Sequence, residues 1–101
     1  MTVVADISIM PVGEGTSLSK YVKRAVEELK KACLKVDVGA MSTSVEARST
    51  EEVFRAFEKA KEALFEMGIK KVYMMIKVDE RRDKPISIES KKTAILRQGN
   101  C

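Results

Sequence analysis

The sequence predicts an α+β fold in which strands and helices follow the order β-α-β-β-α-β, with one more helix at the C-terminal end. Four short stretches alternate apolar and polar side chains with a period of two, which is typical of half-buried strands. Two longer stretches repeat apolar residues at spacings of three and four, which is typical of amphipathic helices. The chain has 101 residues, a length that suits one domain with a single core, so we expect residues 1–101 to form one domain.

Composition narrows the class of protein. The apolar fraction of 45% is ordinary for a globular chain and does not indicate disorder or a fibrous structure. No apolar run approaches the roughly 20 residues that a transmembrane helix needs. The first ten residues lack the basic start and the cleavage site of a signal peptide. We therefore expect a cytoplasmic protein with no membrane partner.

Charge and reactive side chains argue against nucleic-acid binding and against catalysis. The 19 basic and 15 acidic residues are interleaved, without a basic stripe punctuated by aromatic residues. The chain has no histidine, which argues against a zinc site, a Cys–His pair and the usual general base near neutral pH. Cys33 lies in the apolar stripe of the first predicted helix, where a free thiol behaves as a small hydrophobic residue. Cys101 is the last residue. The sequence therefore predicts a non-enzyme with no metal and no cofactor.

The first strand and helix are predicted between residues 3 and 33. Residues 3–10 alternate, and Pro11, which cannot donate a backbone hydrogen bond, ends this strand. The loop 12–16 contains two glycines but no phosphate-binding fingerprint, and Ser17 is predicted to cap the helix that follows. The residues expected to face the core are Val3, Ala5, Ile7 and Ile9 of the strand and Leu18, Val22, Ala25, Val26, Leu29 and Cys33 of the helix.

A hairpin and a second helix follow. Residues 34–38 form a short strand stopped by Gly39, and residues 41–48 form the next, with Thr43 and Val45 toward the core. Ser49 and Glu52 fit a capping box, and Gly68 lies where a C-terminal cap glycine belongs. The apolar stripe of this helix comprises Val53, Phe57, Ala60, Leu64 and Met67.

The last strand is residues 71–79, followed by a charged turn at 80–85 and a short helix from about 88 to 98 capped by Ser87. With right-handed crossovers, both long helices cover one sheet face, and the first and third strands lie in the middle. This arrangement is the ferredoxin-like sandwich. It leaves the second sheet face bare, with a mixture of side chains too apolar to face water, so we expect homo-oligomers formed through this face. These side chains are Val4, Ser8, Met10, Ser44, Glu46, Tyr73, Met75 and Lys77.

Four stretches of the sequence resemble a known family: residues 7–11, 17–22, 41–46 and 76–83. Together they resemble the MTH1187/YkoF-like thiamine-binding proteins, also called the UPF0045 or DUF77 family. The resemblance implies a ferredoxin-like subunit, sheet-to-sheet dimers often paired into tetramers, and binding of thiamine or its hydroxymethylpyrimidine precursor without catalysis. Ala47 stands where the family usually has Gly, and Ser42 where it often has Gly or Asn, which predicts an altered pocket edge.

The resemblance also implies which residues would meet such a ligand. Thiamine carries a cationic thiazolium and an aminopyrimidine that donates and accepts hydrogen bonds, so Glu46 could pair with either. Thr43 contributes only if the start of its strand twists or bulges, because strict alternation points it at the core. The serines near the start of the first long helix could equally serve as caps. The expected ligand-binding residues are Ser8, Ser17, Ser19, Tyr21, Ser42, Thr43, Glu46, Tyr73 and Met75.

Two points stay open at this level. Arg81, Arg82 and Asp83 are predicted to form an ion-pair turn or a tetramer contact, although a phosphorylated ligand would favour the arginines as a phosphate grip. The rival function is a structural or regulatory homo-oligomerisation module with no small-molecule ligand. An RNA binder ranks last, because the paired strand aromatics of RNA-recognition domains are missing.

Overall fold

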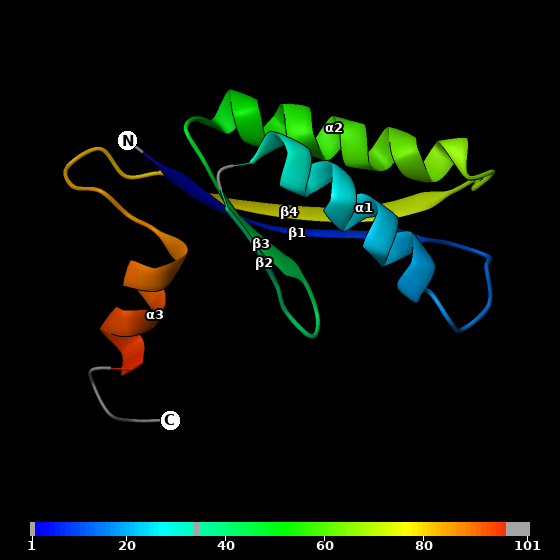
Figure 1. The fold of residues 1–101 in the computed structure, drawn as a ribbon, viewed down its shortest axis with the longest axis horizontal. Helices are drawn as coiled ribbons and strands as arrows, with labels where there is room; N and C mark the ends of the chain where they lie inside the picture. Colours follow the sequence, from blue (N-terminus) through cyan, green and yellow to red (C-terminus); the bar gives the residue numbers. More distant parts are fainter. Residues whose placement is uncertain (1, 34, 97–101) are drawn as a thin grey trace.

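The computed structural model describes residues 2–33 and 35–96. Figure 1 shows the four strands and three helices, in the order that the periodicity predicts. None of the helices within these residues is both long and apolar enough to cross a bilayer. The elements are β1 (Val3–Pro11), α1 (Ser19–Ala32), β2 (Lys35–Val38), β3 (Thr43–Ala47), α2 (Thr50–Glu66), β4 (Val72–Asp79) and α3 (Ile88–Leu96).

The strands form one antiparallel sheet in the order β2-β3-β1-β4. The first and third strands are therefore central, as predicted for a ferredoxin-like sandwich. In Figure 1, α1 and α2 lie side by side over one face of the sheet, whereas α3 lies on the opposite side, toward the end where β1 begins. The predicted α+β class is confirmed.

The main core lies between the sheet and the two long helices. The side chains of β1 alternate as predicted, with Val3, Ala5, Ile7 and Ile9 all buried. They meet Leu29 of α1 and Leu64 of α2, which are among the largest fully buried side chains of the described residues. Removing this apolar surface from water is the main favourable contribution to folding.

The strand β3 begins later than the sequence predicts. Met41 and Ser42 lie in the turn that joins β2 to β3, and the first residue of β3 is Thr43. Gly39 N donates to Ser42 O at 2.9 Å and closes this turn. A Cβ atom on Gly39 would lie only 2.8 Å from Ser42 O, so the tight turn requires glycine there.

The late start of β3 leaves part of β1 without a neighbour on that side. The pairing of β1 with β3 ends at Ile7 opposite Thr43, whereas its pairing with β4 continues to Pro11 opposite Val72. Consequently residues 8–11 of β1 have a paired edge toward β4 and an unpaired edge toward β3.

The caps of α2 are confirmed and the cap of α1 is not. Ser49 Oγ accepts from Glu52 N at 3.2 Å, and Arg48 N donates to Glu52 Oε1 at 3.2 Å, so the capping box is present in a slightly shifted form. Gly68 has a φ of +91° just past the end of α2, as a cap glycine does. The prediction that Ser17 caps α1 is wrong: the cap residue is Leu18, which makes no side-chain cap hydrogen bond. Leu18 packs against the core and takes the cap position, so Ser17 lies one residue before the cap of α1.

The helix α3 is capped as predicted but packs little. Ser87 Oγ accepts from Ser90 N at 2.9 Å. Only Ile88 of α3 is buried, and Ile95 and Leu96, expected to share a packed side with it, are 66% and 68% exposed. Three predicted features lie outside the described residues. They are the end of this helix near Gln98, the last residue Cys101, and the first residue of the predicted strand 34–38.

The second sheet face is bare over only part of its area, which corrects the expectation. Val4 is buried against Ile86 and Ile88, because the segment leading into α3 folds over that end of the sheet. Farther along, Tyr73 and Met75 of β4 are each 56% exposed, as predicted. The apolar surface of this face is therefore confined to the end away from α3.

We predict that Leu64→Ala lowers the free energy of unfolding by about 2–5 kcal/mol, because Leu64 is fully buried and the substitution leaves a cavity. Urea denaturation followed by circular dichroism measures the change. Phe54→Ala on the same helix is the control, since Phe54 is 48% exposed. Equal losses for the two variants would contradict this account of the core.

Candidate functional site

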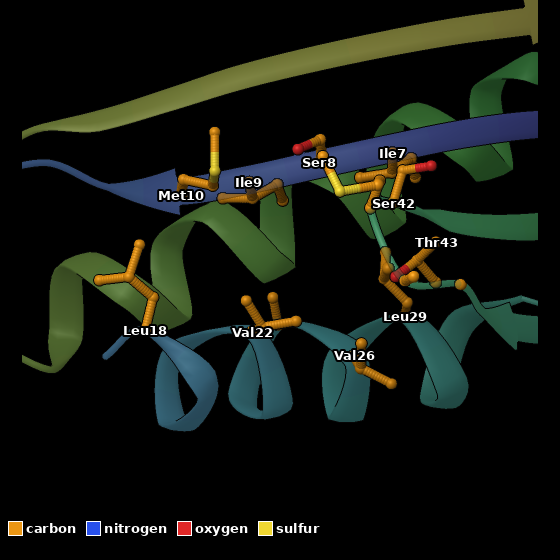
Figure 2. A pocket seen from close by; sticks show the side chains of 14 residues that line it. Ile7, Ser8, Ile9, Met10, Leu18, Val22, Val26, Leu29, Ser42 and Thr43 are labelled. Carbon is orange, nitrogen blue, oxygen red and sulfur yellow. The ribbon is translucent and has the colours of Figure 1, made fainter. Parts of the chain in front are cut away.

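A cavity of about 250 Å³ lies between α1 and β1 and is the candidate site. Figure 2 shows α1 running alongside β1, with Leu18, Val22, Val26 and Leu29 coming from the helix. Residues 7–10 of β1 form the opposite wall, and the turn 39–43 closes one end. Most of the lining is aliphatic.

The cavity exists because of where β3 begins. Its β1 wall coincides with the residues that have no strand beside them on the β3 side. Along an antiparallel strand, the backbone N–H and C=O groups of alternate residues point to the same side. Some of these groups in residues 8–10 therefore face the side that β3 leaves open, where a ligand could pair with them as a strand would.

Three of the lining residues carry a hydroxyl, namely Ser8, Ser42 and Thr43, and none of the described lining residues carries a charge. Ser8 lines the cavity at the strand edge, since Figure 2 shows its side chain on the side of β1 away from α1. Ser42 Oγ donates to Asp6 Oδ1 at 2.7 Å, so this hydroxyl is already oriented. An apolar cavity with a few hydroxyls suits a small, flat, largely neutral ring that makes a few hydrogen bonds.

The structure thus brings together three of the residues predicted from the sequence. Thr43 is buried toward the core, as strict alternation requires. It nevertheless lines the cavity, because the cavity lies on the helix side of the sheet. No twist or bulge is needed for its contribution.

The structure places the other predicted residues elsewhere. Ser17 and Ser19 are exposed at the start of α1, and Tyr21 is buried in the main core, with Lys20 Nζ 5.0 Å from its ring centroid. Tyr73 and Met75 lie on the second sheet face, directly opposite Met10 and Ser8 in the β1–β4 register. These two are therefore neighbours of the cavity wall without lining the cavity.

Glu46 is engaged by α3. Its Oε1 accepts from Ile88 N at 2.7 Å, so the carboxylate lies at the N-terminus of α3, where a negative charge is favourable. Ion pairs from Lys91 to Asp79 and from Lys92 to Asp37 hold the same helix to the sheet. Glu46 pairs with Val4 in the register, three positions along β1 from the Ile7–Thr43 pair at the cavity.

The charged turn after β4 forms the ion pairs that the sequence predicts. Arg81 contacts both carboxylate oxygens of Asp83, and this pairing lowers the pKa of Asp83 to about 2. Arg82 Nε donates to Glu80 Oε2 at 2.8 Å. The two arginines lie near residues 2 and 3, at the other end of β1 from the cavity. Residues 4–6 of β1 separate the two linings, so Val3 and Ile7 are about 13 Å apart along the strand.

One thiol and the acidic side chains are the remaining reactive groups among the described residues. Burial raises the pKa of the Cys33 thiol to about 11, so this thiol stays protonated and weakly nucleophilic at neutral pH. Over the residues that the structure describes, no cluster of three His, Cys, Asp or Glu side chains could hold a metal.

The residue that sequence reasoning missed is Asp6. Its place two residues before Ser8 put it on the same strand face, but nothing in the sequence showed its contact with Ser42.

We predict that Glu46→Ala loosens α3. The change removes the acceptor for Ile88 N and costs about 1 kcal/mol of local stability, typical of a lost N-terminal cap. Hydrogen exchange at Ile88 should accelerate about fivefold if that amide exchanges by local opening. Glu46→Gln, which keeps an acceptor oxygen, should show a smaller effect. Unchanged exchange in both variants would show that Glu46 does not hold α3.

Comparison with known proteins gives a consistent result at the sequence level. A family model described as "Thiamine-binding protein" matches residues 5–96. A UPF0045 protein of Methanocaldococcus jannaschii is 44% identical over 93 residues, covering 92% of this chain and 91% of that protein. A UPF0045 protein of Methanothermobacter thermautotrophicus is 39% identical over 82 residues, covering 80% and 83%.

Solved structures agree with the fold. The crystal structure of the Methanocaldococcus jannaschii protein superposes with a TM-score of 0.86 and covers 93% of this chain and 95% of that chain. A Thermotoga maritima protein, described as a candidate thiamine biosynthesis/salvage protein, superposes with a TM-score of 0.78 at 25% identity. That match covers 94% of this chain and 99% of that one.

Proposed function

This chain belongs to the thiamine-binding protein family, and on that premise we propose that it binds thiamine or its hydroxymethylpyrimidine precursor without catalysing a reaction. The observation that carries the proposal is the apolar cavity beside β1. It gathers Ser8, Ser42 and Thr43, three residues that the family resemblance had marked for ligand contact.

The chemistry of the cavity matches one half of thiamine. The aminopyrimidine ring is flat and neutral, so aliphatic walls can cover its faces while hydroxyls and the open edge of β1 meet its donors and acceptors. The thiazolium ring is a permanent cation. Burying an unpaired cation is costly, and none of the described lining residues is an acid, so this ring lies outside the cavity.

We assign no reaction to the site. A hydroxyl nucleophile needs an adjacent base, and the acid that the structure places beside one of these residues is Asp6, whose carboxylate is a weak base for the Ser42 hydroxyl. The raised pKa of the Cys33 thiol likewise argues against a nucleophilic role for that residue. Binding, rather than turnover, is what such a site supports.

The proposal includes a homo-oligomer assembled through the second sheet face, as a dimer of dimers. Met10, Tyr73 and Met75 are 38%, 56% and 56% exposed, and Met10 lies directly opposite Tyr73 across β1 and β4. This apolar surface favours a second copy as its cover. The exposed Ile95 and Leu96 of α3 offer a separate surface for pairing dimers. Because Ser8 and Met10 line the cavity and adjoin Met75 and Tyr73, the ligand would lie near this interface.

The same exposed face also favours the rival function, an oligomerisation module without a small-molecule ligand. The two functions differ in what they require of the cavity. A module needs the second face and not the cavity, whereas a binding protein needs the cavity open.

We predict that isothermal titration calorimetry detects saturable binding of thiamine and of hydroxymethylpyrimidine, and that Val22→Trp removes it. Val22 lines the cavity at its exposed side, so the larger ring can fill the space. The matched control is Lys23→Trp, which adds the same ring to the exposed face of α1. Ser42→Ala should weaken binding about fivefold, the effect of losing roughly 1 kcal/mol of hydrogen bonding.

Heat of dilution alone from folded wild-type protein would favour the oligomerisation module. Equal binding by wild type and Val22→Trp would place the ligand elsewhere. Thiamine phosphate should bind no more tightly than thiamine, since Arg81 and Arg82 lie at the far end of β1. A strong preference for the phosphate would bring these arginines into the site of the assembled protein.

We predict that Tyr73→Lys combined with Met75→Lys dissociates the oligomer, because two charges would be buried unpaired in the interface. Sedimentation velocity measures the change in mass. Phe54→Lys is the control, since Phe54 is 48% exposed on α2, which covers the opposite face of the sheet. Assembly that survives the double change would exclude the second face as the interface.

A further inference from the structure

One acidic side chain of the second sheet face contacts a residue of the candidate cavity. Asp6 is a half-buried residue of β1, and its Oδ1 accepts from Ser42 Oγ at 2.7 Å. Ser42 itself lines the apolar cavity. The carboxylate is therefore one hydrogen bond away from the place where the proposed function puts a neutral ring.

Asp6 also borders a second hollow on the other side. This hollow, of about 460 Å³, lies between the second sheet face and α3, and Ser44, Lys77 and Lys91 contribute to its polar lining. Asp6 is thus in contact with a residue of the apolar cavity and itself lines a second hollow that contains charged side chains. A carboxylate in this position can meet a ligand group that the apolar cavity does not accept.

The surrounding charges leave Asp6 available for a cation. One row of paired residues crosses the four strands and consists of Asp37, Ser44, Asp6 and Lys77. Asp37 is already paired with Lys92 of α3. Among the residues that the structure describes, Asp6 has no ion-pair partner within 4.0 Å, although Lys77 is its neighbour on β4. A half-buried carboxylate without a close partner gains from a cation brought by a ligand.

We propose that Asp6 is a specificity-determining residue that selects cationic ligands, its carboxylate balancing the thiazolium charge while the aminopyrimidine occupies the cavity. The proposal deepens the proposed function and rests on it. Glu46, the acid first expected in this role, is held at α3 by Ile88 N. Asp6 is the acid that contacts a cavity residue.

The test is calorimetry of wild type and Asp6→Asn with two probes, thiamine and hydroxymethylpyrimidine. Asparagine has the same shape and can still accept from Ser42, so the change removes the charge. We expect thiamine to bind about tenfold more weakly to the variant, the size typical of one charge-assisted contact. Hydroxymethylpyrimidine, which is neutral, should keep its affinity within about twofold.

Asp37→Asn is the matched control. It removes the same charge from the same row of the sheet at a residue of the same burial class, but Asp37 already has Lys92 as its partner. Its thiamine affinity should stay close to that of wild type. Added salt should weaken thiamine binding to wild type more than to Asp6→Asn, because an ion pair is screened.

Each outcome of these titrations supports or overturns the role of Asp6. An unchanged thiamine affinity in Asp6→Asn overturns the role of Asp6 and leaves the proposed function standing. So does an equal loss for both probes, since it would mean that Asp6 acts only by holding Ser42. Failure of wild type to bind either probe overturns the proposed function, and the role of Asp6 with it. Selective loss of thiamine, with the control unaffected, supports the proposal.

Discussion

The turn between β2 and β3 sets the geometry on which the candidate site depends. Gly39 and Ser42 close it with a backbone hydrogen bond, and the close approach at Gly39 leaves no room for a side chain. Because the turn is tight, β3 first pairs at Thr43 and stops short of the end of β1. A longer β3 would cover residues 8–10 and fill the space that now forms the cavity. One constraint on the backbone thus creates a wall, an open strand edge and the position of Ser42.

The second sheet face is divided into two regions with different roles. At one end, Val4, Ile86 and Ile88 pack together and Glu46 holds the start of α3, so this region is closed within the subunit. At the other end, Met10, Tyr73 and Met75 remain exposed. The row from Asp37 to Lys77 lies between them. Proposed assembly and proposed ligand binding would therefore meet at the exposed end, next to the cavity.

Side-chain periodicity predicted the fold well because it reports burial. The alternation in β1, the stripe of α2 and the capping box at Ser49 are each local patterns. The structure confirms the first and the third, and it confirms the stripe except for its last member, Met67, which is 41% exposed. Ser17 was misjudged because the start of α1 is set by the packing of Leu18, which is a tertiary contact. Tyr21 was expected near a ligand and is buried, since the helix phase that exposes Val22 turns Tyr21 toward the core.

Spacing along the chain was enough to predict the order of the elements and the core face of each strand. The motifs that carry the family resemblance pointed to Ser8, Ser42 and Thr43, three residues that line the cavity. Which carboxylate lies near that cavity depends instead on tertiary contacts. Glu46 and Asp6 share a sheet face, and alternation cannot tell them apart. What separates them is that α3, from far along the chain, donates Ile88 N to Glu46, whereas the β2–β3 turn brings Ser42 to Asp6. The first of these contacts spans 42 positions of the chain and the second spans 36, so no local pattern in the sequence contains either of them.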